Sequence, residues 1–338
     1  MAVHEPPIDR PYDIRRLIDL VAVAIAIGLV VAIFSVYLQR GFVPGDAFTY
    51  LGAGERLNAG HALYALVAAD RQVGIEPPFW TVPLLSPPPI AVLWRPLAAL
   101  PGELGVYVWW AIDLAAVAIA IGLMIRRRPL LVSAGVIVVS VPLVYEIGVA
   151  NMNGLILLGL ILTWRAFVLG DDRATGIPVG LMAAFKLTPG VLAWWLIVER
   201  RWSALRWAIA TGLVVLAISL LGAGLDAHLR YLGIVRETAG QGARPLSLAG
   251  MAIYLGAPAA IANVLPTIAL VVGIVAAALL RKRPDLAFVA TVLAMLLGAP
   301  TISINWFIFM LACLAPVAWP WREQVPREAA PAGATPPA

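Results

Sequence analysis

The sequence predicts an all-helical bundle that crosses a membrane many times. Of its 338 residues, 62% are hydrophobic and only 13% are charged, and the mean hydropathy is +0.91. Soluble domains are about half apolar and about a quarter charged, so this composition excludes an ordinary soluble fold. Short arginine clusters separate the apolar runs, a pattern typical of the cytoplasmic ends of spanning helices. The net charge of +5 therefore indicates membrane orientation and no nucleic-acid partner.

Long apolar runs predict the individual spans, because about 20 residues are needed to cross the hydrocarbon core. The first run, residues 17–37, has no small-residue cleavage site after it and is predicted to remain as a signal anchor. The second, residues 104–125, ends at the arginine triplet 126–128, which marks the inner side. The later predicted spans are residues 130–145, 155–169, 205–221, 259–280, 286–298 and 305–319.

With two half-spans included, we expect about nine to eleven spans in all. They form one transmembrane domain, residues 1–320, and the Pro/Ala-rich residues 321–338 predict a disordered cytoplasmic tail. Residues 223–247 are predicted to be an external loop, and residues 248–258 an interfacial segment.

The segment between the first two spans, residues 38–102, is predicted to lie on the outer side of the membrane. Asp46 follows the helix-breaking pair Pro44-Gly45, so it is a candidate N-cap for a short amphipathic helix over residues 48–57. An ionisable group so close to a bilayer exit is also a functional candidate. Residues 90–100 are apolar but too short to cross, and they predict a helix that lies in the interface.

Lys186 lies in the middle of an unusual apolar run, residues 177–198. Basic residues flank this run on both sides, so a single plain span would violate the charge rule. Because Pro189-Gly190 follows the lysine, we predict two half-spans that meet near Lys186, as happens where a protein lines a binding cavity. A lysine at the bilayer centre costs about 2.5–3.5 kcal/mol on insertion scales. Lys186 is therefore either a snorkelling anchor or the partner of a lipid phosphate.

The unusual polar residues gather on the predicted outer side, which indicates a polar cavity open to that face. The predicted catalytic residue is Asp46. The predicted substrate-binding residues are Tyr50, Tyr64, Glu76, Asn151, Asn153, Lys186, Arg230, Arg244 and Asn305. The two arginines among them have the alternative interpretation of ordinary loop charges. Neither a metal nor another cofactor is expected, since no Cys/His metal spacing occurs, and the single cysteine excludes an intrachain disulfide.

Five short motifs carry a resemblance to a known family. They are Asp46-Ala47-Phe48-Thr49-Tyr50, Gly60-His61-Ala62-Leu63-Tyr64, Ser86-Pro87-Pro88-Pro89, Gly148-Val149-Ala150-Asn151-Met152-Asn153 and Ala184-Phe185-Lys186-Leu187-Thr188-Pro189. In this order the motifs resemble those of glycosyltransferase family 87, membrane mannosyltransferases of the GT-C superfamily that use polyprenyl-phosphate mannose. The chain departs from the family pattern twice. It lacks the family's Gln in the Asn151 turn, and Ile304-Asn305-Trp306 stands where the family often has a His.

The resemblance implies a GT-C fold in a bacterial plasma membrane, with the site facing outside and Asp46 as the general base. The implied reaction moves a hexose, mannose in the family, from a polyprenyl-phosphate donor to a lipid or glycolipid acceptor with inversion. A phosphate leaves without a proton, so one carboxylate suffices, whereas glycoside hydrolysis needs a pair. Two alternatives stay open: a transporter or flippase of a lipid-linked sugar, and an inactive scaffold. A transporter would also have a broken helix and a midplane cation, but it needs no carboxylate after the first span.

Overall fold

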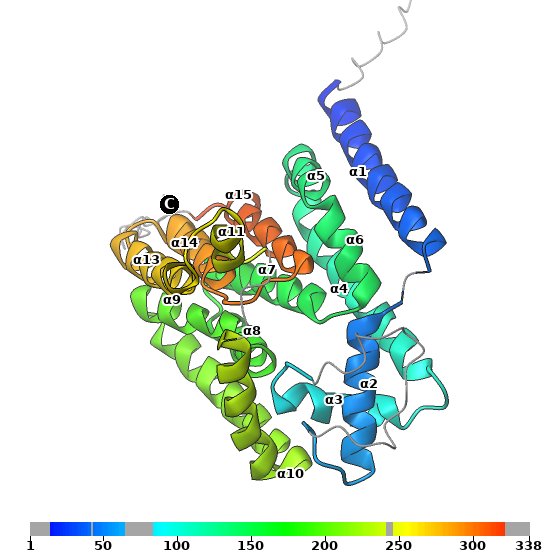
Figure 1. Cartoon of the computed structure of the whole chain (residues 1–338). Coiled ribbons are helices and arrows are strands. Elements are labelled where there is room, and N and C mark those ends of the chain that lie inside the picture. The colour runs from blue at the N-terminus through cyan, green and yellow to red at the C-terminus, as the bar shows by residue number, and fades with distance from the viewer. Residues whose placement is uncertain (1–13, 42, 65–83, 241–245, 322–338) are drawn as a thin grey trace, which may run out of the picture.

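The computed structural model describes residues 14–41, 43–64, 84–240 and 246–321. In these residues all regular elements are helices, as the composition predicts (Figure 1). The α-helices are α1 (Ile14–Gln39), α2 (Gly45–Asn58), α3 (Pro88–Ala98), α4 (Leu104–Ile125), α5 (Pro129–Val138), α6 (Ser140–Val149), α7 (Asn153–Leu169), α8 (Asp172–Phe185), α9 (Leu192–Val198), α10 (Trp202–Gly240), α11 (Leu248–Tyr254), α12 (Ala259–Ala262), α13 (Leu265–Leu279), α14 (Pro284–Leu297) and α15 (Ala315–Ala318). Two 3-10 helices, η2 (Thr188–Val191) and η3 (Ile304–Leu314), complete the described elements. The predicted tail lies outside the described residues from residue 322 onward.

Within the described residues, four helical segments are long and apolar enough to cross a membrane: Ile14–Gln39, Leu104–Ile125, Trp202–Arg236 and Ala259–Leu279. The bent pair α5 and α6 would make a fifth, and four further apolar helices have 10–17 residues. The predicted all-helical membrane bundle is thereby confirmed, while the total of nine to eleven spans stays a prediction. The bounds of α4 coincide with the predicted span.

Two predicted segments differ from the structure. Residues 130–145 do not form one straight span, because α5 and α6 meet at 70° around Val139. The external loop predicted from residue 223 is instead helical as far as Gly240, with a kink at Gly224 (φ 78°, ψ 164°). Both errors have a local cause. Two bent halves are as apolar as one straight helix, and the polar residues after the kink suit an exposed helix as well as a loop.

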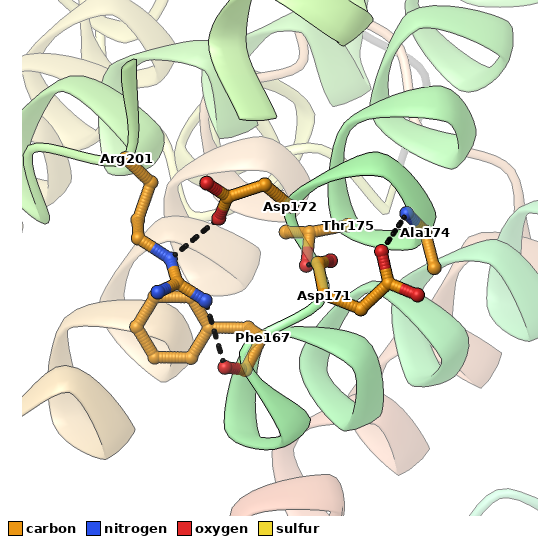
Figure 2. Close-up of polar contacts among 6 residues, drawn as sticks. All are labelled: Phe167, Asp171, Asp172, Ala174, Thr175 and Arg201. Carbon is orange, nitrogen blue, oxygen red and sulfur yellow. Dashed lines mark hydrogen bonds and ion pairs between the residues drawn. The ribbon is translucent and has the colours of Figure 1, made fainter. Parts of the chain in front are cut away.

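Hydrogen bonds tie the arginine-rich turns together at one end of the bundle. Figure 2 shows that the guanidinium of Arg201 pairs with Asp172 (3.0 Å) and donates to the carbonyl of Phe167 (3.0 Å). It also lies over the Phe167 ring, 4.8 Å from the ring centre. Asp171 accepts a bond from the backbone N–H of Ala174 and so caps α8. Arginine thus fastens the end of α7 to the starts of α8 and α10.

The same end includes the C-terminal part of the described chain. Arg128 donates to the carbonyl of Val317 (3.3 Å), and the indole of Trp164 donates to the carbonyl of Trp319 (3.0 Å). In Figure 1, α2 and α3 lie at the opposite end, beside the far part of α10. The basic turns and the segment that carries Asp46 are therefore at different ends of the bundle.

The predicted break at Lys186 is confirmed. Helix α8 ends at Phe185, Lys186 is extended (φ −149°, ψ 125°), and the chain resumes helical structure in η2 and α9. Pro189 contributes to the break, since proline lacks an N–H and disfavours a helical residue before it. At about 1.5 Å per residue, the 14 residues of α8 place Lys186 about 21 Å from the basic end. The 17 residues of α7 place Asn153 about 25 Å from that end, so both lie at a similar depth.

Helix α8 packs closely against α10 through two glycines four residues apart, Gly176 and Gly180. A Cβ on Gly176 would collide with the carbonyl oxygen of Ala204, and one on Gly180 with that of Ala208. The two backbones approach too closely for any side chain, which is the small-xxx-small contact of membrane helices. This contact holds the first half of the broken helix in place.

We expect Gly180→Ala to lower the thermal stability of the detergent-solubilised protein, because the new methyl group must displace backbone atoms of α10. Overpacking of this kind costs about 1–3 kcal/mol. Gly212→Ala on α10 is the matched control, since a Cβ there meets nothing within 4 Å. Alanine should leave stability unchanged at that position or raise it by up to about 1 kcal/mol. Equal melting temperatures for the two variants would contradict the close packing of α8 on α10.

Candidate active site

The site is built around the turn between α6 and α7. Ala150 in this turn has a left-handed backbone (φ 50°, ψ 52°), which is uncommon for a residue with a Cβ. Two adjacent tryptophans of α4 hold the turn: Trp109 donates to the carbonyl of Ala150 (3.0 Å) and Trp110 to that of Ile147 (2.7 Å). The last carbonyls of a helix have no partner within the helix, so these indoles satisfy the end of α6. They fix the chain direction that presents Asn151.

Asp46 reaches this turn from α2. It is the second residue of that helix, whose N-cap is Pro44 without a side-chain bond, so the predicted capping role of Asp46 is wrong. The helix starts at Gly45, three residues before the predicted residue 48, so Asp46 lies in its first turn and its carboxylate reaches a distant partner. The Nδ2 of Asn151 donates to Oδ2 of Asp46 at 2.7 Å. The Oδ1 of Asn151 accepts from the backbone N–H of Met152 at 2.6 Å, which fixes the direction of this amide.

A fully buried carboxylate, Glu146 of α6, lies behind this turn. Its Oε1 accepts from the backbone N–H groups of Asn153 (2.8 Å) and Gly154 (3.3 Å), which are donors left free by the first turn of α7. Its Oε2 accepts from the Nδ2 of Asn153 (3.0 Å) and the Nδ2 of Asn305 (2.7 Å). These four hydrogen bonds allow a carboxylate to be buried. Glu146 thereby joins α6, α7 and η3.

Lys186 meets the same cluster from the break after α8. Its Nζ donates to Oδ1 of Asn153 at 2.5 Å and lies 3.8 Å from the centre of the Trp306 ring and 5.9 Å from that of Phe309. Aromatic faces stabilise a nearby cation. The ammonium group also lies close enough to Asp46 and Glu146 for their charges to interact. The structure thus brings together a carboxylate and an ammonium that are 140 residues apart in the chain, since 186 − 46 = 140.

The cluster has an accessible layer and a buried layer. Asp46, Asn151 and Lys186 keep part of their surface exposed. Glu146, Asn153 and Asn305 are at most 1% exposed. The Nδ2 groups of Asn153 and Asn305 donate to Glu146. The predicted contacts of these two asparagines with substrate stay predictions.

The predicted tyrosines are packed into the protein. Tyr50 is buried between the rings of Trp94 and Trp109, with centroids 5.9 and 6.3 Å away. Burial, with a smaller contribution from the charge of Asp46, raises the pKa of its phenol well above the usual value. The half-buried Tyr64 donates to the carbonyl of Ser86 (2.9 Å) and stacks on a tyrosine of α10, Tyr231. Substrate contact by Tyr50 and Tyr64 stays a prediction.

The predicted substrate-binding residue Arg230 lies apart from this cluster. Arg230 forms an ion pair with Asp226 at 2.7 Å on the surface of α10, where both side chains are mostly exposed. This contact agrees with its alternative interpretation as an ordinary surface charge. Glu76 and Arg244 lie outside the described residues. Among those described, no group of three or more His, Cys, Asp or Glu could hold a metal ion.

Sequence reasoning missed the buried carboxylate Asp113, and it placed Glu146 among the polar residues of the outer side without a role in the site. Asp113 of α4 is fully buried, lies near the backbone amides of Gly154 and Leu155, and packs against the position where Gly154 has no side chain. The sequence carried a signal for Asp113. Asp113 is an acidic residue inside a long apolar run, and intramembrane carboxylates mark functional regions.

Fold and site together define an integral membrane protein with a polar cluster enclosed by spanning and shorter helices. The family model of glycosyltransferase family 87 matches residues 85–304, which is more than half of the chain. The chain belongs to glycosyltransferase family 87. The match includes Glu146, Asn151, Asn153 and Lys186, whereas Asp46 and Asn305 lie outside it.

A curated relative agrees with this assignment. The chain is 27% identical over 218 residues to the polyprenol-phosphate-mannose-dependent alpha-(1-2)-phosphatidylinositol pentamannoside mannosyltransferase of Mycolicibacterium smegmatis. The alignment covers 60% of this chain and 50% of the relative, so the chain matches about half the length of that protein. No solved structure matches this chain.

We expect Ala150→Val to destabilise the protein, because a β-branched side chain is strained in the left-handed conformation and this fully buried position has no room for it. The expected loss is about 1–3 kcal/mol. Ala150→Gly should match or exceed the wild type, since glycine adopts this conformation freely. Thermal unfolding in detergent measures both variants. An equal loss in the glycine variant would show that the buried methyl group matters and the backbone conformation does not.

Proposed function

We propose that this protein is a membrane mannosyltransferase that moves mannose from a polyprenyl phosphate to a lipid or glycolipid acceptor. Family membership and the activity for which the relative is named support the reaction class and the donor. The observation that carries the proposal is the pairing of Asp46 with Asn151 and of Lys186 with Asn153. Consecutive Cα atoms are about 3.8 Å apart, so the two asparagine Cα atoms are separated by at most about 7.6 Å. The turn between α6 and α7 thus carries both the partner of the proposed base and the partner of the cation.

In the proposed reaction, Asp46 acts as the general base. Its carboxylate takes the proton of an acceptor hydroxyl while that oxygen forms a bond to the anomeric carbon of the sugar. The bond between that carbon and the phosphate oxygen breaks on the opposite face, and its electron pair leaves with the phosphate. A β-linked donor would therefore give an α-linked product. The hydrogen bond from the Nδ2 of Asn151 fixes the orientation of the Asp46 carboxylate. It does not protonate the carboxylate, which stays able to accept the proton of the acceptor hydroxyl.

Lys186 supplies the positive charge that the departing phosphate requires. As the bond breaks, negative charge grows on the phosphate oxygens, and a pre-positioned cation stabilises that charge. An ammonium has three N–H donors, and Asn153 takes one of them, which leaves donors for an anion. The ring of Trp306 restricts the side of the ammonium group from which an anion can approach.

The proposed site opens toward the outer face of the membrane. By the positive-inside rule, the end that carries the arginine clusters lies in the cytoplasm. Lys186 and Asn153 lie about 21–25 Å from that end along their helices, which is less than the ~30 Å of the hydrocarbon core. The reacting groups would then lie just within the outer half of the bilayer, within reach of a phosphate whose polyprenyl chain stays in the lipid.

The proposed activity is tested with purified protein, labelled polyprenyl-phosphate mannose and an extract of native lipids. Label in a lipid product supports the transferase. Donor that crosses the bilayer of a proteoliposome without forming a product would indicate a transporter. Donor that binds without either outcome would indicate an inactive scaffold.

We expect Asp46→Asn to lower transfer by about 10²–10⁴-fold, because asparagine keeps an oxygen for the Asn151 bond but cannot take a proton. Thermal stability should change little, since Asp46 is not a cap and a first-turn charge contributes only about 0.3–1 kcal/mol. Asp226→Asn, at an exposed carboxylate of α10, is the matched control and should keep full activity. An active Asp46→Asn variant would exclude the proposed base and leave Glu76 as the next carboxylate to test.

We expect Lys186→Met to preserve the fold and to raise the donor KM or lower kcat. The combined loss in kcat/KM should be about 10–150-fold, which corresponds to the ~1.5–3 kcal/mol of a hydrogen bond to a charged group. The chain's other lysine, Lys282, is exposed beyond α13, and Lys282→Met provides the matched control. Unchanged donor kinetics in the Lys186 variant would reduce this lysine to a snorkelling anchor.

A further inference from the structure

We infer that Glu146 is a positioning residue that sets the direction of Lys186 through the side-chain amide of Asn153. The inference rests on the proposed role of Lys186 as the partner of the donor phosphate. Glu146 is fully buried and lies close enough to Lys186 for their charges to interact, but in the described structure it makes no hydrogen bond to the ammonium group. The route from Glu146 to Lys186 consists of two hydrogen bonds, both of them made by Asn153.

The chemistry at the two ends of the Asn153 amide allows only one orientation. A carboxylate only accepts hydrogen bonds, and an ammonium only donates them. The Nδ2 of Asn153 therefore faces Glu146, and its Oδ1 faces Lys186. A flipped amide would bring its NH₂ group against the ammonium and its oxygen against the carboxylate. The negative charge of Glu146 thus orients the Asn153 amide so that its Oδ1 accepts a hydrogen bond from Lys186.

An amide at position 146 could not serve the same donors. Four N–H groups point at Glu146, two at each oxygen: Asn153 N and Gly154 N at Oε1, and the Nδ2 groups of Asn153 and Asn305 at Oε2. A glutamine offers one oxygen and one NH₂ group. If its oxygen keeps the two backbone donors, its NH₂ group faces the NH₂ groups of both asparagines.

The two asparagines differ in how easily they can flip. The Oδ1 of Asn305 is buried without a hydrogen bond in the described structure, so Asn305 can turn this oxygen to a new donor without breaking another bond. Asn153 can turn only by withdrawing its oxygen from Lys186. Removing the charge of Glu146 should therefore weaken the hydrogen bond between Asn153 and Lys186, although residues 146 and 186 are 40 positions apart.

The test exchanges the polarity of this route and then restores it. Glu146→Gln breaks the pairing of donors and acceptors between residues 146, 153 and 186. The double variant Glu146→Gln with Asn153→Asp restores this pairing and has the same net charge as the wild type. In the double variant the glutamine NH₂ group donates to the new carboxylate and to the flipped Asn305. The new carboxylate then accepts from Lys186. A purely structural role of Glu146 does not predict that a second substitution repairs the first.

Two readouts are measured on the full-length protein in detergent: affinity for polyprenyl phosphate and kcat/KM for labelled polyprenyl-phosphate mannose. We expect Glu146→Gln to weaken both by about 10-fold or more, the factor for one hydrogen bond to a charged group. We expect the double variant to recover most of that loss. Size-exclusion profiles and thermal unfolding identify which variants are folded. If the single variant does not fold, the double variant is compared directly with the wild type, and near-wild-type affinity supports the inference.

Several outcomes would overturn the inference. A folded Glu146→Gln variant with wild-type affinity would show that Lys186 needs no positioning. A folded double variant no better than the single one would show that amide polarity is irrelevant, and failure of both variants to fold would make Glu146 purely structural. Wild-type protein that neither binds polyprenyl phosphate nor transfers mannose would overturn the proposed function, and this inference with it. Wild-type activity together with an unaffected single variant would overturn the positioning role alone.

Discussion

The burial of Glu146 is the constraint on which the rest of the site depends. A carboxylate inside an apolar helix bundle is costly unless its oxygens are fully hydrogen-bonded. Glu146 obtains four donors only where the first turn of α7 and the residue Asn305 of η3 converge on α6. Any arrangement that separates these three elements would leave the charge without partners. The same bonds that make burial tolerable therefore specify how the helices meet.

Irregular backbone gathers around this buried carboxylate. The bend between α5 and α6, the left-handed Ala150 and the break at Lys186 all interrupt helices that lie within the apolar bundle. Such interruptions are tolerated at membrane depth where protein groups satisfy the freed backbone. Here the indoles of Trp109 and Trp110 bind the carbonyls at the end of α6. The interrupted helices can then place their ends, and the polar side chains at those ends, at a depth where a continuous helix has no end.

The hydrogen bond from Asn151 to Asp46 connects a part of the chain that matches the family model with a part that lies outside the match. The matched region, residues 85–304, contains the α6–α7 turn and Lys186, whereas Asp46 precedes it. The structure nevertheless brings α2 to that turn, with an Nδ2–Oδ2 distance of 2.7 Å. The aromatic packing of Tyr50 on Trp94 and Trp109 holds α2 against α3 and α4 and so supports this approach. The candidate base thus packs against the matched region even though the family match begins after it.

By itself, the sequence determined the features that depend on neighbouring residues: the helical membrane class, the bounds of α4, and the helix break at Lys186, which follows from a proline three residues away. It also indicated which polar residues stand out from an apolar chain. Only the tertiary structure decided the bend at Val139, the helical continuation past Gly224, the absence of a cap at Asp46, and the division of the polar residues into an accessible and a buried layer. The physical reason is the separation of the partners. The bond between Asp46 and Asn151 spans 105 positions and the bond between Glu146 and Asn305 spans 159, so no local pattern records that these side chains meet.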